Sequence, residues 1–220
     1  EELVRIRDLL TENEALKQKV DELTIENTRL QQDRYELTNL RQLYNLDNQY
    51  DEYEKTGARI IAKDAGNWFY SFVIDKGAKD GIAVDMNVMA GSGLVGRVVA
   101  VGPNWAKVKS IIADDSNVSA MVLASSDNLI VSGNLKLYNS GVIEFEQLID
   151  SDNVVVEGDK IVTSNISDKF LPGILIGYVN TINSDANNLT KSGYITPAVD
   201  FEHLEEVLVI MELKQTVSED

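Results

Sequence analysis

Leucine recurs at every seventh position through the first part of the chain, and this spacing predicts one apolar stripe on a long helix. The series runs Leu9, Leu16, Leu23, Leu30 and Leu37. Neither glycine nor proline interrupts the pattern between Leu3 and Tyr53, so we expect a single helix on the order of 75 Å long. A helix packed in a globular core is typically shorter and has a wider apolar face. We therefore interpret residues 1–56 as a coiled-coil stalk rather than as a core helix.

The residues between the leucines indicate how many helices meet and in which direction. If the leucines occupy the d positions, the a positions mix apolar residues with amides, as in Ile6, Asn13, Val20 and Asn27. A buried asparagine at position a is best satisfied by its own copy across a parallel two-stranded seam. The pattern predicts an in-register parallel homodimer with contacts from Ile6, Leu9, Asn13, Leu16, Val20, Leu23, Asn27, Leu30 and Leu37.

The spacing of apolar residues changes after Leu37. The series continues as Leu40, Leu43, Leu46, Tyr50 and Tyr53, which shifts the phase of the seam and adds aromatic residues near its end. We expect this end of the helix to splay or to dock onto the β-rich part of the chain.

Beyond residue 56, short runs of β-favouring residues alternate with turn residues at intervals of roughly 8 to 12 residues. One such run, 135–138, is interpreted as a strand. The runs indicate two all-β units, one near 57–112 and the other near 113–199. We expect 200–213 to return and complete the first unit, because an open sheet edge would invite aggregation. Residues 214–220 are expected to be a disordered tail, and the fold is predicted to be mainly β with a long N-terminal α-helix.

Composition narrows the classes of function. The formal net charge of −16 argues against binding to nucleic acid or to an anionic membrane surface. The absence of cysteine excludes disulfides, zinc–thiolate sites and thiol nucleophiles. No apolar run approaches the ~20 residues of a membrane span. Because the chain starts at Glu1 inside the heptad pattern, we expect a fragment whose membrane anchor lies upstream.

Two sequence features resemble catalytic or binding motifs. Gly91, Gly93 and Gly96 match the spacing GxGxxG, but 97–101 reads as a strand, whereas a dinucleotide site needs these glycines to open a helix. We therefore predict a tight hairpin. His203 is the only histidine, which excludes a multi-histidine metal site, and its polar surroundings predict a solvent-facing loop residue. No catalytic, cofactor-binding or metal-binding residue is predicted, and the protein is not expected to be an enzyme.

Two acidic stretches also have simple structural interpretations. Asp114 and Asp115 are expected to cap their own turn rather than to act as a paired acid and base. The stretch 150–153 begins like a calcium loop, but Val154 and Val156 occupy positions that require ligands and a turn glycine.

Four aromatic residues are considered for partner docking, of which strand alternation sends part to the core. Trp68, Tyr70 and Trp105 are selected because aromatic side chains commonly anchor protein interfaces. Strand alternation directs Trp68 and Tyr70 to one face and Phe69 to the other.

Several stretches, taken in order, resemble the extracytoplasmic β region of the rod shape-determining MreC family. They are Asn-Trp-Phe at 67–69, Val-Ile-Asp-Lys-Gly at 73–77, Asp-Gly-Ile at 80–82, Leu-Val-Gly-Arg-Val-Val at 94–99, Val-Gly-Pro at 101–103, Gly-Asp-Lys-Ile-Val-Thr-Ser at 158–164 and Phe-Leu-Pro-Gly-Ile at 170–174 with Ile-Gly at 176–177. The sequence departs from the family pattern at Asn165, where a glycine is expected, and at Leu171, which separates Phe170 from Pro172.

The resemblance implies two small six-stranded β-barrels after a coiled-coil dimer, held at the cell membrane by a single upstream transmembrane helix. It also implies an extracytoplasmic, non-enzymatic scaffold for peptidoglycan synthesis in rod elongation. The implied partners are a penicillin-binding protein, MreD and, indirectly, the actin-like MreB. A periplasmic adaptor of an efflux or secretion system is the alternative, although such adaptors usually insert a helical hairpin between β halves. An unrecognised hydrolase is a third hypothesis, which assays on cell-wall peptides would test.

Overall fold

The computed structural model describes residues 2–63, 70–186 and 189–215. The chain divides between Arg41 and Gln42 into two compact units. The unit that begins at Gln42 contains both β-barrels and is called the head below. We describe each unit separately.

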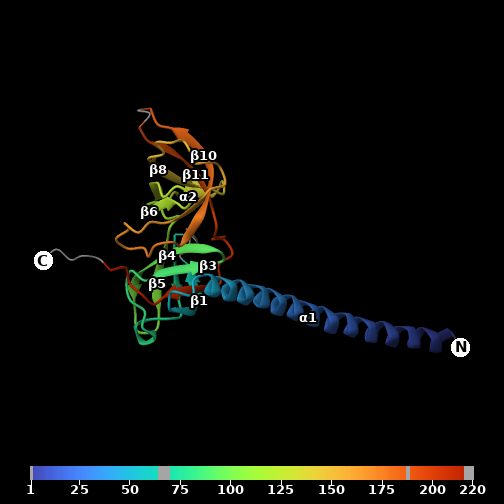
Figure 1. Ribbon diagram of the computed structural model, residues 1–220. Helices are drawn as coiled ribbons and strands as arrows, with labels where there is room; N and C mark the ends of the chain where they lie inside the picture. Colours follow the sequence, from blue (N-terminus) through green and yellow to red (C-terminus); the bar gives the residue numbers. More distant parts are fainter. Residues whose placement is uncertain (1, 64–69, 187–188, 216–220) are drawn as a thin grey trace. The chain divides into compact units, whose positions relative to one another are not determined.

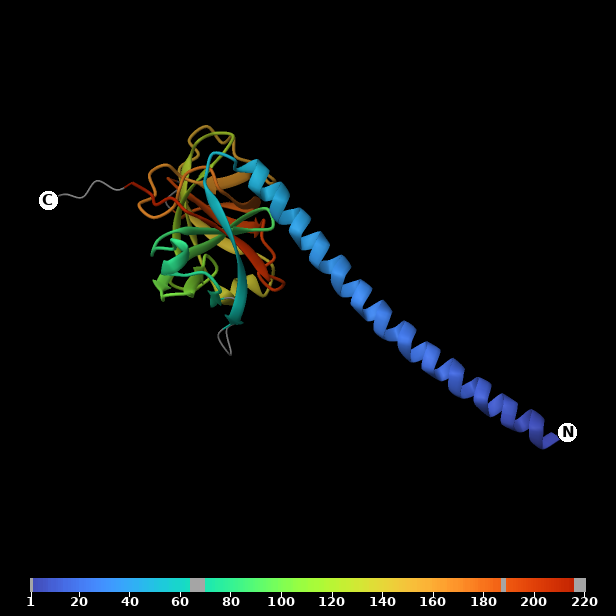
Figure 2. The ribbon, with the colours of Figure 1, turned by 90° about the horizontal axis from the view of Figure 1, so that it is seen from below.

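The helix α1 (Glu2–Gln49) is continuous, as Figures 1 and 2 show. Its leucine, glutamate, lysine, arginine and glutamine residues have high helix propensity, and it contains no glycine or proline. Every side chain from Arg5 to Thr38 is exposed in the single chain. The helix ends at Gln49 rather than near Tyr53, and a turn leads directly into the first strand.

The first barrel closes through six antiparallel strands in the order β1-β12-β3-β4-β5-β2. These strands are β1 (Lys55–Lys63), β2 (Ser71–Ile74), β3 (Asn87–Ala90), β4 (Gly93–Val101), β5 (Ala106–Ser110) and β12 (Glu206–Ile210). A one-turn 3₁₀ helix (Ala78–Asp80) follows β2. Along β5 the side chains alternate between buried and half-buried, as expected for one face toward a barrel core.

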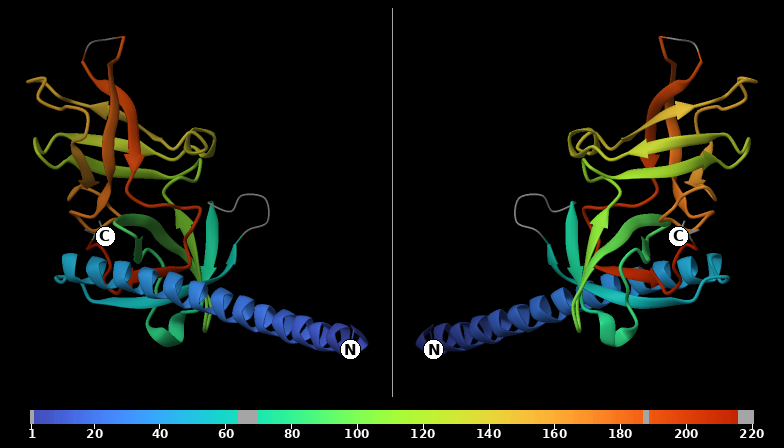
Figure 3. Two further views of the ribbon diagram at one scale, coloured as in Figure 1. Left: turned by 90° about the vertical axis from the view of Figure 1, so that its right-hand side faces the viewer. Right: turned by 90° about the vertical axis from the view of Figure 1, so that its left-hand side faces the viewer.

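The second barrel also closes through six antiparallel strands, in the order β10-β11-β8-β7-β6-β9, and Figure 3 shows it in two views. Its strands are β6 (Asn117–Val122), β7 (Asn128–Ser132), β8 (Ile143–Leu148), β9 (Lys160–Thr163), β10 (Leu175–Ser184) and β11 (Lys191–Pro197). Its core includes Phe145, which is fully buried. Closure leaves no free sheet edge in either barrel.

The two barrels meet closely where β4 approaches β10. A Cβ atom added to Gly93 would lie 2.3 Å from the carbonyl oxygen of Leu175, so only glycine allows this approach. The Asn87 side chain adds two hydrogen bonds across the same junction: it donates to the carbonyl oxygen of Lys169 at 2.9 Å and accepts from the N–H of Leu171 at 2.8 Å.

Two elements differ from the sequence interpretation, whereas the return of the chain to the first barrel agrees with it. Residues 135–138 form a short helix, α2 (Leu135–Tyr138), instead of a strand, because Asn134 caps its first turn by accepting from the N–H groups of Lys136 and Leu137. Strand β1 had no counterpart among the predicted runs. The return of the chain places β12 between β1 and β3.

Candidate interaction site

The side chains of the apolar stripe of α1 are exposed in the described part of the chain. The exposed fractions of its leucine, isoleucine and valine side chains lie between 48% for Leu37 and 61% for Val20. Asn13 and Asn27 are exposed beside them. A row of this length exceeds the isolated apolar residues that are normal on a protein surface and is typical of an interaction site. The structure contains one chain, so the nine predicted seam contacts stay a prediction.

The end of α1 packs against the barrels. Of the two outcomes expected from the sequence, splaying or docking, the structure shows docking. Leu46 is only 1% exposed, and Tyr50 and Leu43 pack against the core. The hydroxyl of Tyr50 accepts a hydrogen bond from the N–H of Leu175 at 3.0 Å, and the hydroxyl of Tyr53 donates to the carbonyl oxygen of Pro172 at 2.9 Å. Burial raises the pKa of both tyrosines above the usual 10.0.

The three aromatic residues predicted to dock partners have different outcomes. Trp68 lies outside the described residues. Trp105 is 40% exposed and lies against Gly102, where an added Cβ would be 2.1 Å from the indole nitrogen. The hydroxyl of Tyr70 donates to Asp115 Oδ1 at 3.0 Å, so this tyrosine already has a partner within the head. The structure does not test docking by any of them.

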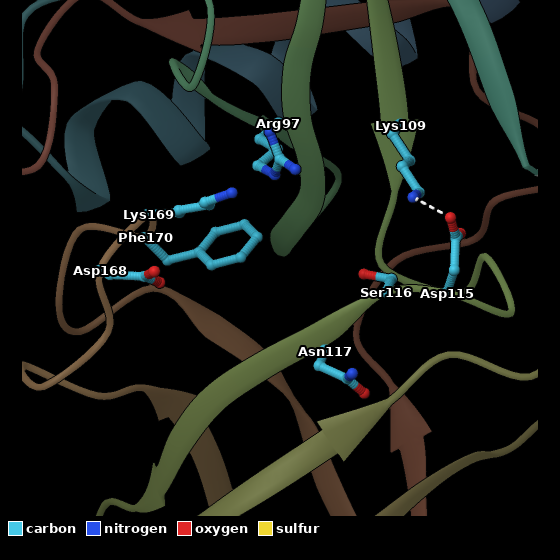
Figure 4. Close-up of a pocket in the computed structure, with 8 residues that line it drawn as sticks. All are labelled: Arg97, Lys109, Asp115, Ser116, Asn117, Asp168, Lys169 and Phe170. Carbon is cyan, nitrogen blue, oxygen red and sulfur yellow. Dashed lines mark ion pairs between the residues drawn. The ribbon is translucent and has the colours of Figure 1, made fainter.

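Residues from both barrels line a cleft with a volume of about 260 Å³. Figure 4 shows its side chains: Arg97 and Lys109 come from β4 and β5, Asp115 and Ser116 from the connection between the barrels, Asn117 from β6, and Asp168, Lys169 and Phe170 from the loop between β9 and β10. The sequence analysis did not predict this cleft, because its residues come from four separate segments that meet only when the barrels pack.

One wall of the cleft carries a compact electrostatic network. Lys109 Nζ lies 2.6 Å from Asp115 Oδ2 and 5.7 Å from the centre of the Tyr70 ring. The hydrogen bond from Lys109, assisted by that from Tyr70, lowers the pKa of Asp115 below its usual 3.8. Asp114 accepts from the N–H of Leu135 at 2.9 Å. Asp115 also accepts a hydrogen bond from its own backbone N–H, as the sequence predicts, while both aspartates additionally bind groups from other segments.

The glycine motif and the histidine have the predicted structural roles. β3 and β4 form a hairpin, and Gly91 occupies the turn with a φ of +59°, a region that favours glycine. Gly96 lies against β5, where an added Cβ would be 1.9 Å from the carbonyl oxygen of Lys109. His203 is solvent-facing and its Nδ1 lies 2.7 Å from Asp200 Oδ2. Among the described residues no group of three or more His, Cys, Asp or Glu side chains is placed to hold a metal ion.

Asp150 is a structural residue that the sequence did not reveal. Its side chain is fully buried, its Oδ2 lies 2.6 Å from Lys191 Nζ, and its Oδ1 accepts from the N–H of Val154 at 2.9 Å. Burial alone would raise the pKa of Asp150, but the hydrogen bonds from Lys191, Val154 and Val155 outweigh it and leave this pKa below 3.8. The residue fixes the loop after β8, and a calcium-like spacing was the only signal in the sequence.

Comparison with known proteins gives one consistent result. The family model for the rod shape-determining protein MreC, barrel core, matches residues 60–211. A cell shape-determining protein MreC from Listeria monocytogenes is 30% identical, and the match covers 94% of this chain and 70% of that protein. A solved structure of MreC from the same species is 29% identical with a TM-score of 0.68, and the match covers 94% of this chain and 100% of that one.

A more distant structure shows the fold alone. It is the complex between penicillin-binding protein PBP2 and MreC from Helicobacter pylori; the matched chain is 14% identical with a TM-score of 0.55, and the match covers 72% of this chain and 99% of that one. Separately, none of the helices within the described ranges is long and apolar enough to cross a membrane.

Proposed function

This chain belongs to the rod shape-determining MreC family, and from that premise we propose that it is a dimeric, non-enzymatic scaffold that organises peptidoglycan synthesis proteins. The observation that carries the proposal is the combination of two closed barrels with a helix whose apolar stripe is exposed among the residues that the structure describes. The stripe supplies self-association, and the barrels supply surfaces for other proteins.

The proposed dimer rests on the chemistry of the stripe. Burying apolar side chains contributes about 25 cal/mol per Å², and a second copy of the same helix is the partner that matches each layer with its own residue. Asn13 and Asn27 favour a parallel, in-register pair, because each amide can then bond to its copy. The apolar layers of such a pair are formed by Ile6, Leu9, Leu16, Val20, Leu23, Leu30 and Leu37.

We propose a penicillin-binding protein as one partner, because the Helicobacter pylori complex unites PBP2 with a protein of this family. MreD and, indirectly, MreB are proposed on the family resemblance. Trp105 offers a 40% exposed aromatic surface for such docking. An anchor upstream of Glu1 would place the chain on the extracytoplasmic side of the cell membrane.

The absence of catalysis is part of the proposal. The histidine pairs with Asp200 in an exposed loop, and the glycines of the GxGxxG match form a hairpin and close strand contacts. An efflux or secretion adaptor is not favoured, because the helix precedes the strands and does not interrupt them.

The test replaces the cell's own copy with stalk variants of the full-length protein. Leu16→Asp with Leu23→Asp places charges on the stripe and should abolish both rod shape and crosslinking between copies. Gln18→Asp with Ile25→Asp introduces the same two charges at exposed positions off the stripe, so it should leave shape and crosslinking unchanged. Rod-shaped cells with the double variant, despite loss of the dimer, would show that scaffolding does not need self-association.

A further inference from the structure

The charge in the cleft between the barrels is opposite to that of the whole chain. The chain carries a formal net charge of −16, yet Arg97, Lys109 and Lys169 all line this cleft. The carboxylates that line it are Asp115 and Asp168, and Arg97 also pairs with Asp85 in an adjoining cavity. With Lys214, which lines that adjoining cavity, four cations face three carboxylates. A local positive site on an acidic protein attracts anionic groups and orients them as they approach.

Two of the three cations that line the cleft itself keep binding capacity for a ligand. Arg97 pairs with Asp85 through Nη1, the one ion pair that it makes with a described residue, and its side chain is 23% exposed. Lys169 is exposed and makes no ion pair with any residue that the structure describes. In Figure 4 the Lys169 side chain extends toward Arg97. Lys109, by contrast, is already paired with Asp115.

The loop that presents Lys169 is held in place before any ligand binds. The carbonyl oxygen of Lys169 accepts from the Asn87 side chain, and the N–H of Phe170 donates to Ser167 Oγ at 3.1 Å. Phe170 is 4% exposed and anchors the loop in the core. Fixing the binding groups in advance reduces the conformational entropy that association must remove.

The cleft continues into a second cavity. This cavity of about 300 Å³ shares Asp168 and Lys169 with the first and continues to Asp85, Leu213 and Lys214. A groove with two adjoining cavities, charges of both signs and an apolar side chain suits an extended peptide better than a single small anion.

We propose that this cleft binds an acidic peptide segment of a partner protein, with one carboxylate held between Arg97 and Lys169. The guanidinium supplies paired donors for the carboxylate, and the ammonium supplies a second charge-assisted hydrogen bond. The inference rests on the proposed scaffold role and names one docking site within it.

Binding is measured by fluorescence anisotropy with the full chain and a rhodamine-labelled, capped eight-residue peptide in which glutamate alternates with serine. The expected result is saturable binding that is at least tenfold weaker for the same peptide with glutamine in place of glutamate. Lys169→Gln should weaken binding at least fivefold, and adding Arg97→Gln should weaken it further. Lys136→Gln, an exposed lysine in α2, is the matched control and should change binding less than twofold.

Thermal melting checks that each variant is folded, which matters because Arg97→Gln leaves Asp85 without its partner. Equal binding of the two peptides, no binding at millimolar protein, or no effect of Lys169→Gln would overturn the proposal. Competition by inorganic phosphate at the peptide's own concentration would also overturn it, because the cleft would then be a small-anion site. A failure of the scaffold role itself would appear in the shape and crosslinking assay, which does not involve the cleft.

Discussion

The ion pair between Asp150 and Lys191 secures the loop that follows β8. Both charges lie largely out of water, with the Lys191 side chain 17% exposed and that of Asp150 fully buried. Removing one member of such a pair leaves the other charge without compensation. The pair therefore links a single carboxylate to the stability of the second barrel.

We predict that Asp150→Asn lowers the free energy of unfolding by about 3 kcal/mol, because Lys191 loses its counter-charge. Urea unfolding at pH 7 measures the change. Asp152→Asn is the matched control, since Asp152 is exposed in the same loop and should leave stability unchanged. Equal stability of the two variants would contradict a structural role for the pair.

The pH dependence of stability tests the same residue independently. The pKa of Asp150 is lowered in the folded state, so its stabilisation is present above the ordinary value of 3.8 and is lost as pH falls through the lowered folded value. The wild type should therefore lose more stability than Asp150→Asn when the pH is reduced below about 4. Equal losses of stability in the two proteins at low pH would show that another carboxylate controls the pH dependence.

Tyr50 shows how one hydroxyl joins the helix to the second barrel. Tyr50→Phe leaves the N–H of Leu175 buried without its acceptor, and we predict a loss of about 1–3 kcal/mol in the free energy of unfolding. Tyr44→Phe, at a site 67% exposed on α1, should have no effect. Chemical denaturation of both variants gives the comparison, and equal values would exclude a stabilising role for this hydrogen bond.

Elements with a regular period were the predictable part of the fold. The seven-residue period predicted α1. The phase change after Leu37 left splaying and docking open, and the burial of Leu46 and Tyr50 shows docking. β1 was missed because its first two residues, Lys55 and Thr56, were assigned to the predicted stalk. The helix α2 was missed because one capping residue, Asn134, decides its conformation.

The asparagines of α1 give a prediction at the scale of the element. If they face each other in a parallel dimer, replacing Asn13 and Asn27 with Leu removes two buried polar layers and should raise stability by roughly 1–3 kcal/mol per layer. The same change should loosen oligomer state or register, since the asparagines select a two-stranded seam. Circular dichroism melting and sedimentation equilibrium measure the two effects.

The control for this prediction is Gln18→Leu, which adds an equally apolar side chain at an exposed position off the stripe. It should change neither melting temperature nor mass. If the double variant behaves like this control in both measurements, the asparagines do not lie in the seam.

At the scale of the whole molecule, long-range closure was harder to predict than local structure. The sequence predicted the strand runs and the return of 200–213 to the first unit. It did not predict the register in which β12 pairs with β1 and β3. The cleft depends on Arg97, Lys109 and the loop carrying Lys169, which are far apart in sequence. Only packing of the finished barrels brings such residues together, so no spacing pattern identifies them.

The division of the chain at Arg41 predicts different consequences for two truncations. Deleting residues 1–41 removes the stripe and should yield a monomeric head that remains folded. Deleting residues 1–53 also removes Leu46 and Tyr50 from the core and should cost at least 3 kcal/mol of the head's stability. Sedimentation equilibrium measures the oligomeric state, and urea unfolding measures the stability. If the protein without residues 1–41 stays dimeric, the main self-contact lies in the barrels. If both truncations are equally stable, the end of α1 does not contribute to the core.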